Sequence, residues 1–431
     1  MELRLRTYLR EPRAWLPARF QARSVAVLVL GNLFKIALGI ATSAIAFRAL
    51  GPVGAGQFAL TLGIIGLLSI IGEFGLRDAA VTFIARALPT DPERAHAVSR
   101  TFFVVKVALA AFAGAFTFLA AGWIAATFYP DANITALIRL GAFSLLTGGL
   151  LGFSLALLEA KQSFASISIL SIVQGVMRAL LILALFAVQE INPFTLFIIE
   201  ALVPLLVFMY SLRFIPKPFL RLRAPYLEHL PAMFHFAKWI GVAAFASTIY
   251  LKLDVLLLGY FLAPAQVGLY AVALAFVSRL DVLKSAVLTT SFPDATRRTT
   301  TAELKSYIRQ SLRLTALASL IVVPLFFIGG AIIEWIYGAA FAGAVSAFVP
   351  LLLAYLLGLN VEPIAYVLYS RNRPQWIARM DIGLLAVNFC MNLILIPALG
   401  IAGAAYSLLI TRCVGAIVTV GLVRRALRSS T

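Results

Sequence analysis

Charged side chains are scarce in this sequence, and acidic ones are the scarcest. Only 13% of the 431 residues are charged, and the 18 Asp and Glu are half as many as the 36 Lys and Arg. A soluble domain carries roughly 25% charged residues. With 62% hydrophobic residues and a mean hydropathy of +0.97, the chain has too little polar surface to fold in water. The composition excludes an ordinary soluble protein and predicts an all-α polytopic membrane protein.

Several chemical motifs are also missing. Only Cys390 and Cys413 occur, both inside apolar runs, so no disulfide framework is predicted. The chain has no GxxxxGK[ST] loop for a nucleotide, and no HExxH motif or Cys/His cluster for a metal. We therefore expect no enzyme, no catalytic residue, no metal site and no bound cofactor. A Na⁺ or H⁺ gradient is the candidate energy source.

Apolar runs dominate what is present. Crossing roughly 30 Å of hydrocarbon takes about 20 residues, and the backbone in lipid must satisfy its own hydrogen bonds. The sequence therefore predicts about twelve transmembrane helices. They lie at approximately 24–50, 56–76, 101–127, 134–158, 164–188, 193–212, 233–258, 267–291, 314–334, 343–368, 376–397 and 400–423.

Lys and Arg alternate between the predicted loops. If the chain starts in the cytoplasm, 26 of the 36 lie in the N-terminal tail and the inside segments, and none lies in the short outside loops. Membrane insertion leaves cations on the cytoplasmic side. The alternation predicts a bacterial inner-membrane protein with both termini in the cytoplasm. The basic loops then set topology and contact anionic lipids, and we expect no nucleic-acid partner.

Two turns half a chain apart are alike. LGPVGAGQFAL at 50–60 and LAPAQVGLYAV at 262–272 align without a gap. A chance match between short turns is the alternative to an internal repeat. A repeat predicts two parallel six-helix halves around a central cavity, with the substrate between them. The predicted domains are a basic tail or interfacial helix at 1–23, a first half at 24–212, a linker at 213–232 and a second half at 233–431.

These turns resemble the polysaccharide or oligosaccharide (O-antigen type) flippase family of the multidrug/oligosaccharidyl-lipid/polysaccharide exporter superfamily. The resemblance lies in 48–60 and 253–276, with support from 73–76 and 397–406. It implies transport of a polyprenyl-pyrophosphate-linked glycan from the cytoplasmic to the outer leaflet, for lipopolysaccharide or exopolysaccharide biosynthesis. It also implies polymerase and glycosyltransferase proteins of the same pathway as partners.

Ten cations remain inside the predicted spans, where each costs about 2.5–3.5 kcal/mol at the bilayer centre. Those near span ends can extend to the headgroups: Arg48, Lys106, Arg139 and Lys238. The deeper ones are predicted to line a water-filled cavity, with buried pairing to acids as the alternative. The predicted substrate-binding residues are Lys35, Arg178, Arg279, Arg412, Asn32, Gln174 and Lys252. Lys284 is the tenth of these cations.

The predicted chemistry divides between these residue types. Cations replace the hydration of a pyrophosphate, while amides bind sugar hydroxyls. Acids at depth are candidates for ion coupling: Asp254, Asp281, Glu362 and Asp381.

Two other functions stay open. A multidrug exporter of the same superfamily would need an acidic or aromatic cavity to attract cations. A membrane-embedded polysaccharide polymerase or ligase would need a large outside domain, and every predicted outside loop is short.

Overall fold

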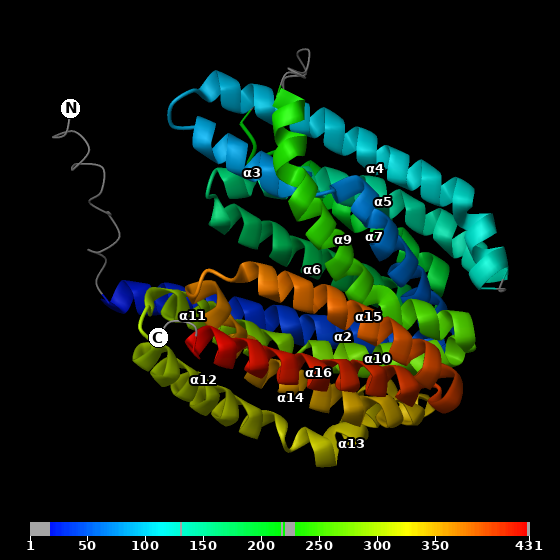
Figure 1. Cartoon of the computed structure of the whole chain (residues 1–431). Coiled ribbons are helices and arrows are strands. Elements are labelled where there is room, and N and C mark those ends of the chain that lie inside the picture. The colour runs from blue at the N-terminus through cyan, green and yellow to red at the C-terminus, as the bar shows by residue number, and fades with distance from the viewer. Residues whose placement is uncertain (1–17, 130–131, 217–218, 220–228, 429–431) are drawn as a thin grey trace.

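The structure, a computed structural model, describes residues 18–129, 132–216, 219 and 229–428, with side chains described there except at 18–36, 132, 239, 243 and 374. Helices are the only regular secondary structure in these ranges (Figure 1). They are α2 Ala18–Glu73, α3 Leu76–Ala87, α4 Pro92–Phe128, α5 Ala132–Ala160, α6 Phe164–Ala187, α7 Pro193–Ser211, α9 Leu230–Phe261, α10 Pro264–Ser278, α11 Asp281–Arg297, α12 Thr301–Val322, α13 Leu325–Tyr337, the 3₁₀ helix η3 Ala339–Ala344, α14 Val345–Ser370, α15 Pro374–Leu399 and α16 Ile401–Arg428.

Each predicted apolar run falls on one helix or on two consecutive helices. Nine described helices are long and apolar enough to cross a membrane, or ten if the bent pair α12–α13 counts as one span. The ninth run is this pair, bent by 46°. α2 contains the first two runs, because Gly51 (φ 63°, ψ 178°) and Pro52 break its helical path. The eighth run is divided into α10 and α11. The all-helical polytopic fold is therefore confirmed.

The helices extend further into the predicted inside loops than expected. α4 begins at Pro92, where the Asp91 side chain accepts a hydrogen bond from the Arg94 N–H. An Asp cap followed by proline is a strong helix start. The helix therefore begins nine residues, about two and a half turns, before the predicted span at residue 101, because hydropathy marks the lipid boundary and capping marks the helix boundary.

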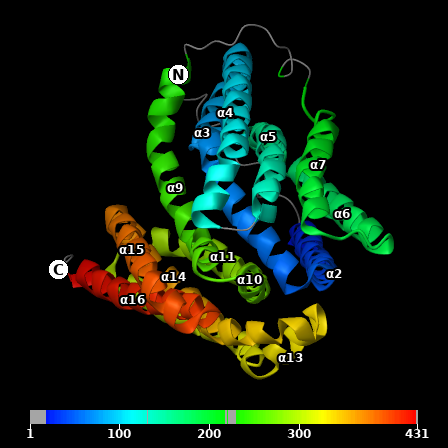
Figure 2. The same ribbon diagram turned by 90° about the vertical axis from the view of Figure 1, so that its right-hand side faces the viewer.

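The helices form two groups that diverge toward the end carrying both termini (Figures 1 and 2). One group contains α3–α7 and the other contains α10–α16, while α2 and α9 pack against members of both. The division at 213–232 stays a prediction, since it falls largely outside the described residues. The inner end of α9 packs on the first group, where the Phe236 and Phe83 rings meet edge to face at 6.0 Å.

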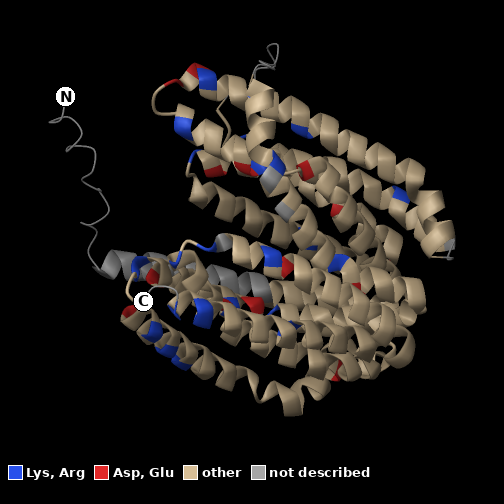
Figure 3. Cartoon of the chain, in the orientation of Figure 1, with Lys and Arg blue, Asp and Glu red and all other residues tan. Residues whose placement is uncertain are grey.

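Charged side chains gather at the end of the molecule that carries the termini (Figure 3). This end comprises α3, the start of α4, the α11–α12 connection and the end of α16. The clustering fits the predicted alternation of loops, and the side of the membrane stays a prediction.

The two repeated turns contact each other directly. Gly56 on α2 lies so close to α10 that an added Cβ would be 1.7 Å from the Pro264 carbonyl oxygen. Gly268 on α10 is equally close to α2, since an added Cβ would be 2.0 Å from the Pro52 carbonyl oxygen. The contact is reciprocal, because Pro52 and Gly56 align with Pro264 and Gly268 in the repeat. Backbone meets backbone here, at the predicted outer end, and only glycine fits.

We expect Gly56→Ala and Gly268→Ala each to lower the unfolding temperature of the purified protein. The methyl group has to displace main chain, and overpacking of this kind costs about 1–3 kcal/mol. Gly383→Ala on α15 is the matched control, since its Cβ has no neighbour within 4 Å. Equal unfolding temperatures in the Gly56 and Gly383 variants would show that the contact is loose.

Candidate substrate site and polar clusters

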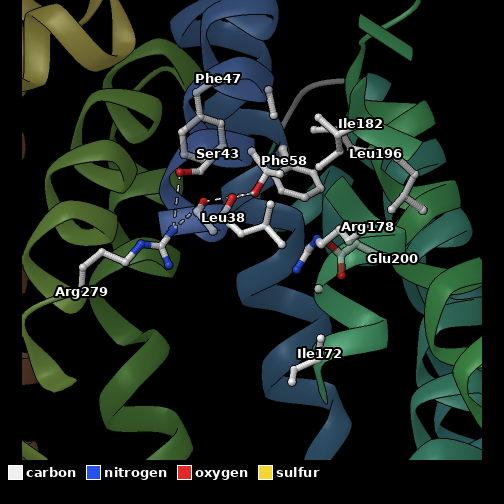
Figure 4. A pocket seen from close by; sticks show the side chains of 15 residues that line it. Leu38, Ser43, Phe47, Phe58, Ile172, Arg178, Ile182, Leu196, Glu200 and Arg279 are labelled. Carbon is white, nitrogen blue, oxygen red and sulfur yellow. Dashed lines mark hydrogen bonds and ion pairs between the residues drawn. The ribbon is translucent and has the colours of Figure 1, made fainter. Parts of the chain in front are cut away.

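A cavity of about 280 Å³ lies where the two groups of helices meet. α2, α6 and α7 form most of its wall, and Arg279 reaches it from the break between α10 and α11 (Figure 4). Its charged lining residues are Arg178, Glu200 and Arg279, and Phe47 and Phe58 add aromatic wall.

Arg178 and Glu200 form an ion pair between α6 and α7. The Arg178 side chain is 44% exposed, so the guanidinium still faces the cavity. Guanidinium carries five N–H donors in a planar fork, and one carboxylate oxygen uses only part of them. Arg178 therefore keeps donors for a ligand while Glu200 fixes its position.

Arg279 connects the second group of helices to α2. Its Nη2 lies 3.4 Å from the Gly39 carbonyl oxygen and 3.4 Å from the Ser43 hydroxyl. These are long hydrogen bonds, and the buried Nε has no partner among the described residues. With Glu200 balancing one of the two arginines, the side chains that line the cavity have a net charge of +1. An anion can compete for this weakly held guanidinium.

The predicted substrate-binding residues do not all meet. Arg178 and Arg279 line the same cavity, while Gln174, half-buried on α6, is not among its lining residues. Lys252 on α9 packs against α2 at Gly66, where an added Cβ would lie 2.9 Å from the Lys252 Cε. The side chains of Asn32 and Lys35 fall outside those that the structure describes, so their roles stay predictions.

Arg412 belongs to a second cluster, formed by α11, α14 and α16. Glu362 accepts from Lys284 Nζ at 2.8 Å and from Arg412 Nη1 at 3.2 Å. The Arg412 guanidinium also lies 5.8 Å from the centre of the Tyr250 ring. Glu362, Arg412 and Asp381 line a cavity of about 270 Å³. The pairing with an acid that the sequence left as an alternative is present here, with all three side chains partly exposed, and the role of Arg412 in substrate binding stays a prediction.

Asp254 on α9 is the most enclosed of the predicted ion-coupling residues, with 8% of its surface exposed. It accepts from the Tyr270 hydroxyl at 3.0 Å and from Asn392 Nδ2 at 2.8 Å. Within the described part of the chain, Asn392 Oδ1 and Asn388 Nδ2 are buried without a partner. Asp281 and Asp381, by contrast, are exposed.

Lys106 is not where the sequence predicted. Its place near a predicted span end indicates a side chain that extends to the headgroups, but Lys106 is 2% exposed and pairs with Glu73 at 2.7 Å. The helix α4 starts earlier than predicted, which places Lys106 well inside it. A cluster of glycines in α5, at 148, 149 and 152, was the available sequence signal for this buried side chain.

The other three cations at predicted span ends each contact another described residue. Arg48 donates to the Trp335 carbonyl oxygen of α13, and Arg139 lies 5.6 Å from the centre of the Phe118 ring. Lys238 Nζ is 3.5 Å from His235 Nδ1.

Comparison with known proteins identifies the family. The model of a family described as polysaccharide biosynthesis protein matches residues 45–346, well over half of the chain. The chain belongs to this family. The resemblance stated from the two turns is thereby confirmed.

Relatives of the chain include two proteins from Haloferax volcanii. The probable low-salt glycan biosynthesis flippase Agl15 is 26% identical over 196 residues, which cover 43% of this chain and 40% of the relative. The probable flippase AglR is 26% identical over 187 residues, which cover 42% and 39%. The chain thus matches about two fifths of the length of these relatives. Their names describe transporters, in agreement with the expectation that the chain is not an enzyme.

Solved structures share the fold of this family member. The lipid II flippase MurJ in an inward closed conformation superposes with a TM-score of 0.74 at 14% identity, covering 93% of this chain and 87% of its own. The MATE multidrug transporter DinF-BH in complex with R6G gives 0.67 at 15% identity, covering 97% of each chain. At these identities the likeness shows the fold alone.

We expect Glu362→Gln to destabilise the protein, because the change leaves two half-buried cations, Lys284 and Arg412, without their carboxylate. Breaking a buried pair costs about 3–5 kcal/mol, and the partial exposure of this one places it toward the lower end. Thermal unfolding in detergent measures the loss. Glu334→Gln, on the exposed side of α13, is the control. If Glu362→Gln and Glu334→Gln unfold at the same temperature, the pairing of Glu362 with the two cations is contradicted.

Proposed function

We propose that this protein is a flippase that moves a polyprenyl-pyrophosphate-linked oligosaccharide from the cytoplasmic to the outer leaflet by alternating access. The observation that carries the proposal is the cavity at the junction of the two groups of helices, with Arg178 and Arg279 in its wall. A pyrophosphate needs such donors once it leaves water, since arginine binds its oxygens through two parallel N–H bonds. Family membership and the flippase names of the relatives support the same substrate class.

The proposed route keeps the lipid tail in the bilayer. The headgroup enters between the diverging groups of helices and reaches Arg279, whose weak bonds to Gly39 and Ser43 are replaced by bonds to the pyrophosphate. Because Arg279 belongs to the second group and Arg178 to the first, a headgroup held by both arginines couples substrate binding to the relative movement of the groups. The glycan is then exported for O-antigen, other lipopolysaccharide or exopolysaccharide biosynthesis, with polymerase and glycosyltransferase proteins as pathway partners. We place the protein in the bacterial inner membrane with both termini in the cytoplasm.

We further propose that a Na⁺ or H⁺ gradient drives this cycle through Asp254. Its carboxylate is enclosed by amide and hydroxyl groups, and the unpaired Asn392 Oδ1 offers a further oxygen. Oxygen donors of this kind suit a hard cation or a proton. Glu362, paired with two cations, and the exposed Asp281 and Asp381 are weaker candidates.

Anionic lipids of the inner leaflet are a proposed partner of α12. Lys305, Arg309 and Arg313 follow one another at four-residue spacing on an exposed face, with no hydrogen bond or ion pair to the described residues. Like charges at this spacing destabilise a helix. Phospholipid headgroups relieve the repulsion, and the exposed Leu317 and Leu320 continue the face toward the acyl chains.

A multidrug exporter is the second candidate function. Glu200 and two phenylalanines line the cavity, and an acid with aromatic walls is what a lipophilic cation requires. The net positive charge of the lining side chains argues against this function, because it would repel a cation.

We expect Arg178→Ala and Arg279→Ala to abolish polymer export in a flippase-null strain while the protein is still made. Each change removes donors for the pyrophosphate from the cavity. Arg297→Ala, at the end of α11 outside the cavity, should leave export unchanged. Polymer yield by gel and membrane content by immunoblot are the measurements.

Proteoliposomes separate the two functions. The wild type should carry a polyprenyl-pyrophosphate-linked oligosaccharide between leaflets and leave a lipophilic dye cation in place. Normal polymer in both cavity variants, or transport of the dye alone, would contradict the flippase proposal.

A further inference from the structure

A third cavity lies between α2 and the first group of helices, away from Arg178 and Arg279. It has a volume of about 200 Å³ and is enclosed by α2, α4 and α5. Its polar lining residues are Ser69, Glu73, Lys106 and Ser144, and glycines form much of the remaining wall. Neither the proposed pyrophosphate site nor the ion-coupling residues use this cavity.

The cavity sits where α2 ends. Phe74 (φ 30°) and Gly75 (φ 69°) take left-handed backbone conformations that separate α2 from α3. Gly75 also lies in close contact with the α9 backbone, since an added Cβ would be 2.5 Å from the Ala237 carbonyl oxygen. Broken helices in transporters commonly place polar groups at a binding site. The break here presents the Glu73 carboxylate beside the cavity.

Lys106 lies at the buried side of the cavity, and Glu73 lies at its exposed side. The lysine side chain is 2% exposed, whereas that of the glutamate is 49% exposed. Lys106 Nζ donates to Glu73 Oε1 at 2.7 Å and to the Gly72 carbonyl oxygen at 3.0 Å. An ammonium has three donors, and the third has no partner among the residues that the structure describes.

The α5 glycines make room for this arrangement. A Cβ on Gly149 would lie 2.6 Å from the Ala110 Cβ, so α4 and α5 approach closely at this point. Gly152 faces the Lys106 stem, with 3.6 Å between an added Cβ and Cε. Gly148 is different, because nothing lies within 4 Å of its added Cβ and it faces the open cavity.

The net charge of the cavity that contains Glu73 and Lys106 indicates which kind of ligand it can bind. One carboxylate and one ammonium leave no net charge, in contrast to the net +1 of the cavity lined by Arg178 and Arg279, the arginine cavity. Ser69 and Ser144 donate to main-chain oxygens and keep acceptor lone pairs. Closely placed acceptors and a spare donor match the alternating hydroxyls of a neutral polyol. An anion would be repelled by Glu73 and a cation by Lys106.

We infer that the Glu73–Lys106 cavity binds a neutral sugar ring of the lipid-linked glycan; this inference rests on the proposed function. Ser69 lies eleven residues after Phe58 of the arginine cavity on the same helix, which is about 16 Å at 1.5 Å per residue. The pyrophosphate and the sugar thus occupy separate subsites along α2. The first recognises the lipid carrier, and the second recognises the glycan.

The test compares two lipids on the purified protein in detergent. Undecaprenyl pyrophosphate without a glycan probes the arginine cavity, and the lipid-linked oligosaccharide extracted from the source cells probes both subsites. The wild type should bind the glycan-bearing lipid at least tenfold more tightly. Gly148→Leu, which fills the cavity and leaves the ion pair intact, should abolish this difference and bind the glycan-free lipid normally. Glu73→Gln/Lys106→Met, which removes both charges together, should do the same.

Gly122→Leu on α4 is the matched control, since its added Cβ also has no neighbour within 4 Å and it lines none of these cavities. It should bind both lipids like the wild type. A tenfold difference retained in Gly148→Leu, or equal binding of both lipids by the wild type, would overturn the sugar subsite and leave the flippase proposal standing. A wild type that binds neither lipid would overturn the flippase proposal and the subsite with it.

Discussion

The contact between Gly56 and Gly268 is the constraint on which the rest of the structure depends. Main chain lies against main chain in both directions, between Gly56 and Pro264 and between Gly268 and Pro52. The contact holds α2 and α10 together at the predicted outer end, while the groups of helices diverge at the end with the termini (Figure 1). In the proposed mechanism the outer end is closed, and export of the glycan requires these two turns to separate.

Charge placement follows from the same architecture. Lipid offers no partner to a cation, so cations inside the bundle need a carboxylate, a carbonyl or a ring face. Arg178 has Glu200, Lys106 has Glu73, and Lys284 and Arg412 share Glu362. Among the described residues, Arg279 has only two long hydrogen bonds, both to α2. In the proposed mechanism, this difference makes Arg279 the cation that a substrate anion displaces most readily, and a link between binding and movement.

The sequence allowed the helices and the repeat to be predicted, because both depend on local patterns. Hydropathy located the twelve runs, and LGPVGAGQFAL with LAPAQVGLYAV predicted two equivalent turns. The sequence did not reveal the contact between those turns, nor which acid pairs with which cation. Lys106 and Glu73 are 33 residues apart on different helices, and Arg412 and Glu362 are 50 apart. Such pairs are set by tertiary packing, so depth along a helix alone misplaced Lys106.

Distances between spin labels in lipid bilayers test the central claim most directly. Labels at Glu93 on α4 and Ala302 on α12 measure the distance between the two groups at the end with the termini. Labels at Val53 on α2 and Gln266 on α10 measure the distance between the two repeated turns. Cys390 and Cys413 are replaced beforehand, since both are exposed. Addition of the lipid-linked oligosaccharide should shorten the first distance and lengthen the second in the same molecules. A second distance that stays constant while the protein transports its substrate would contradict the account.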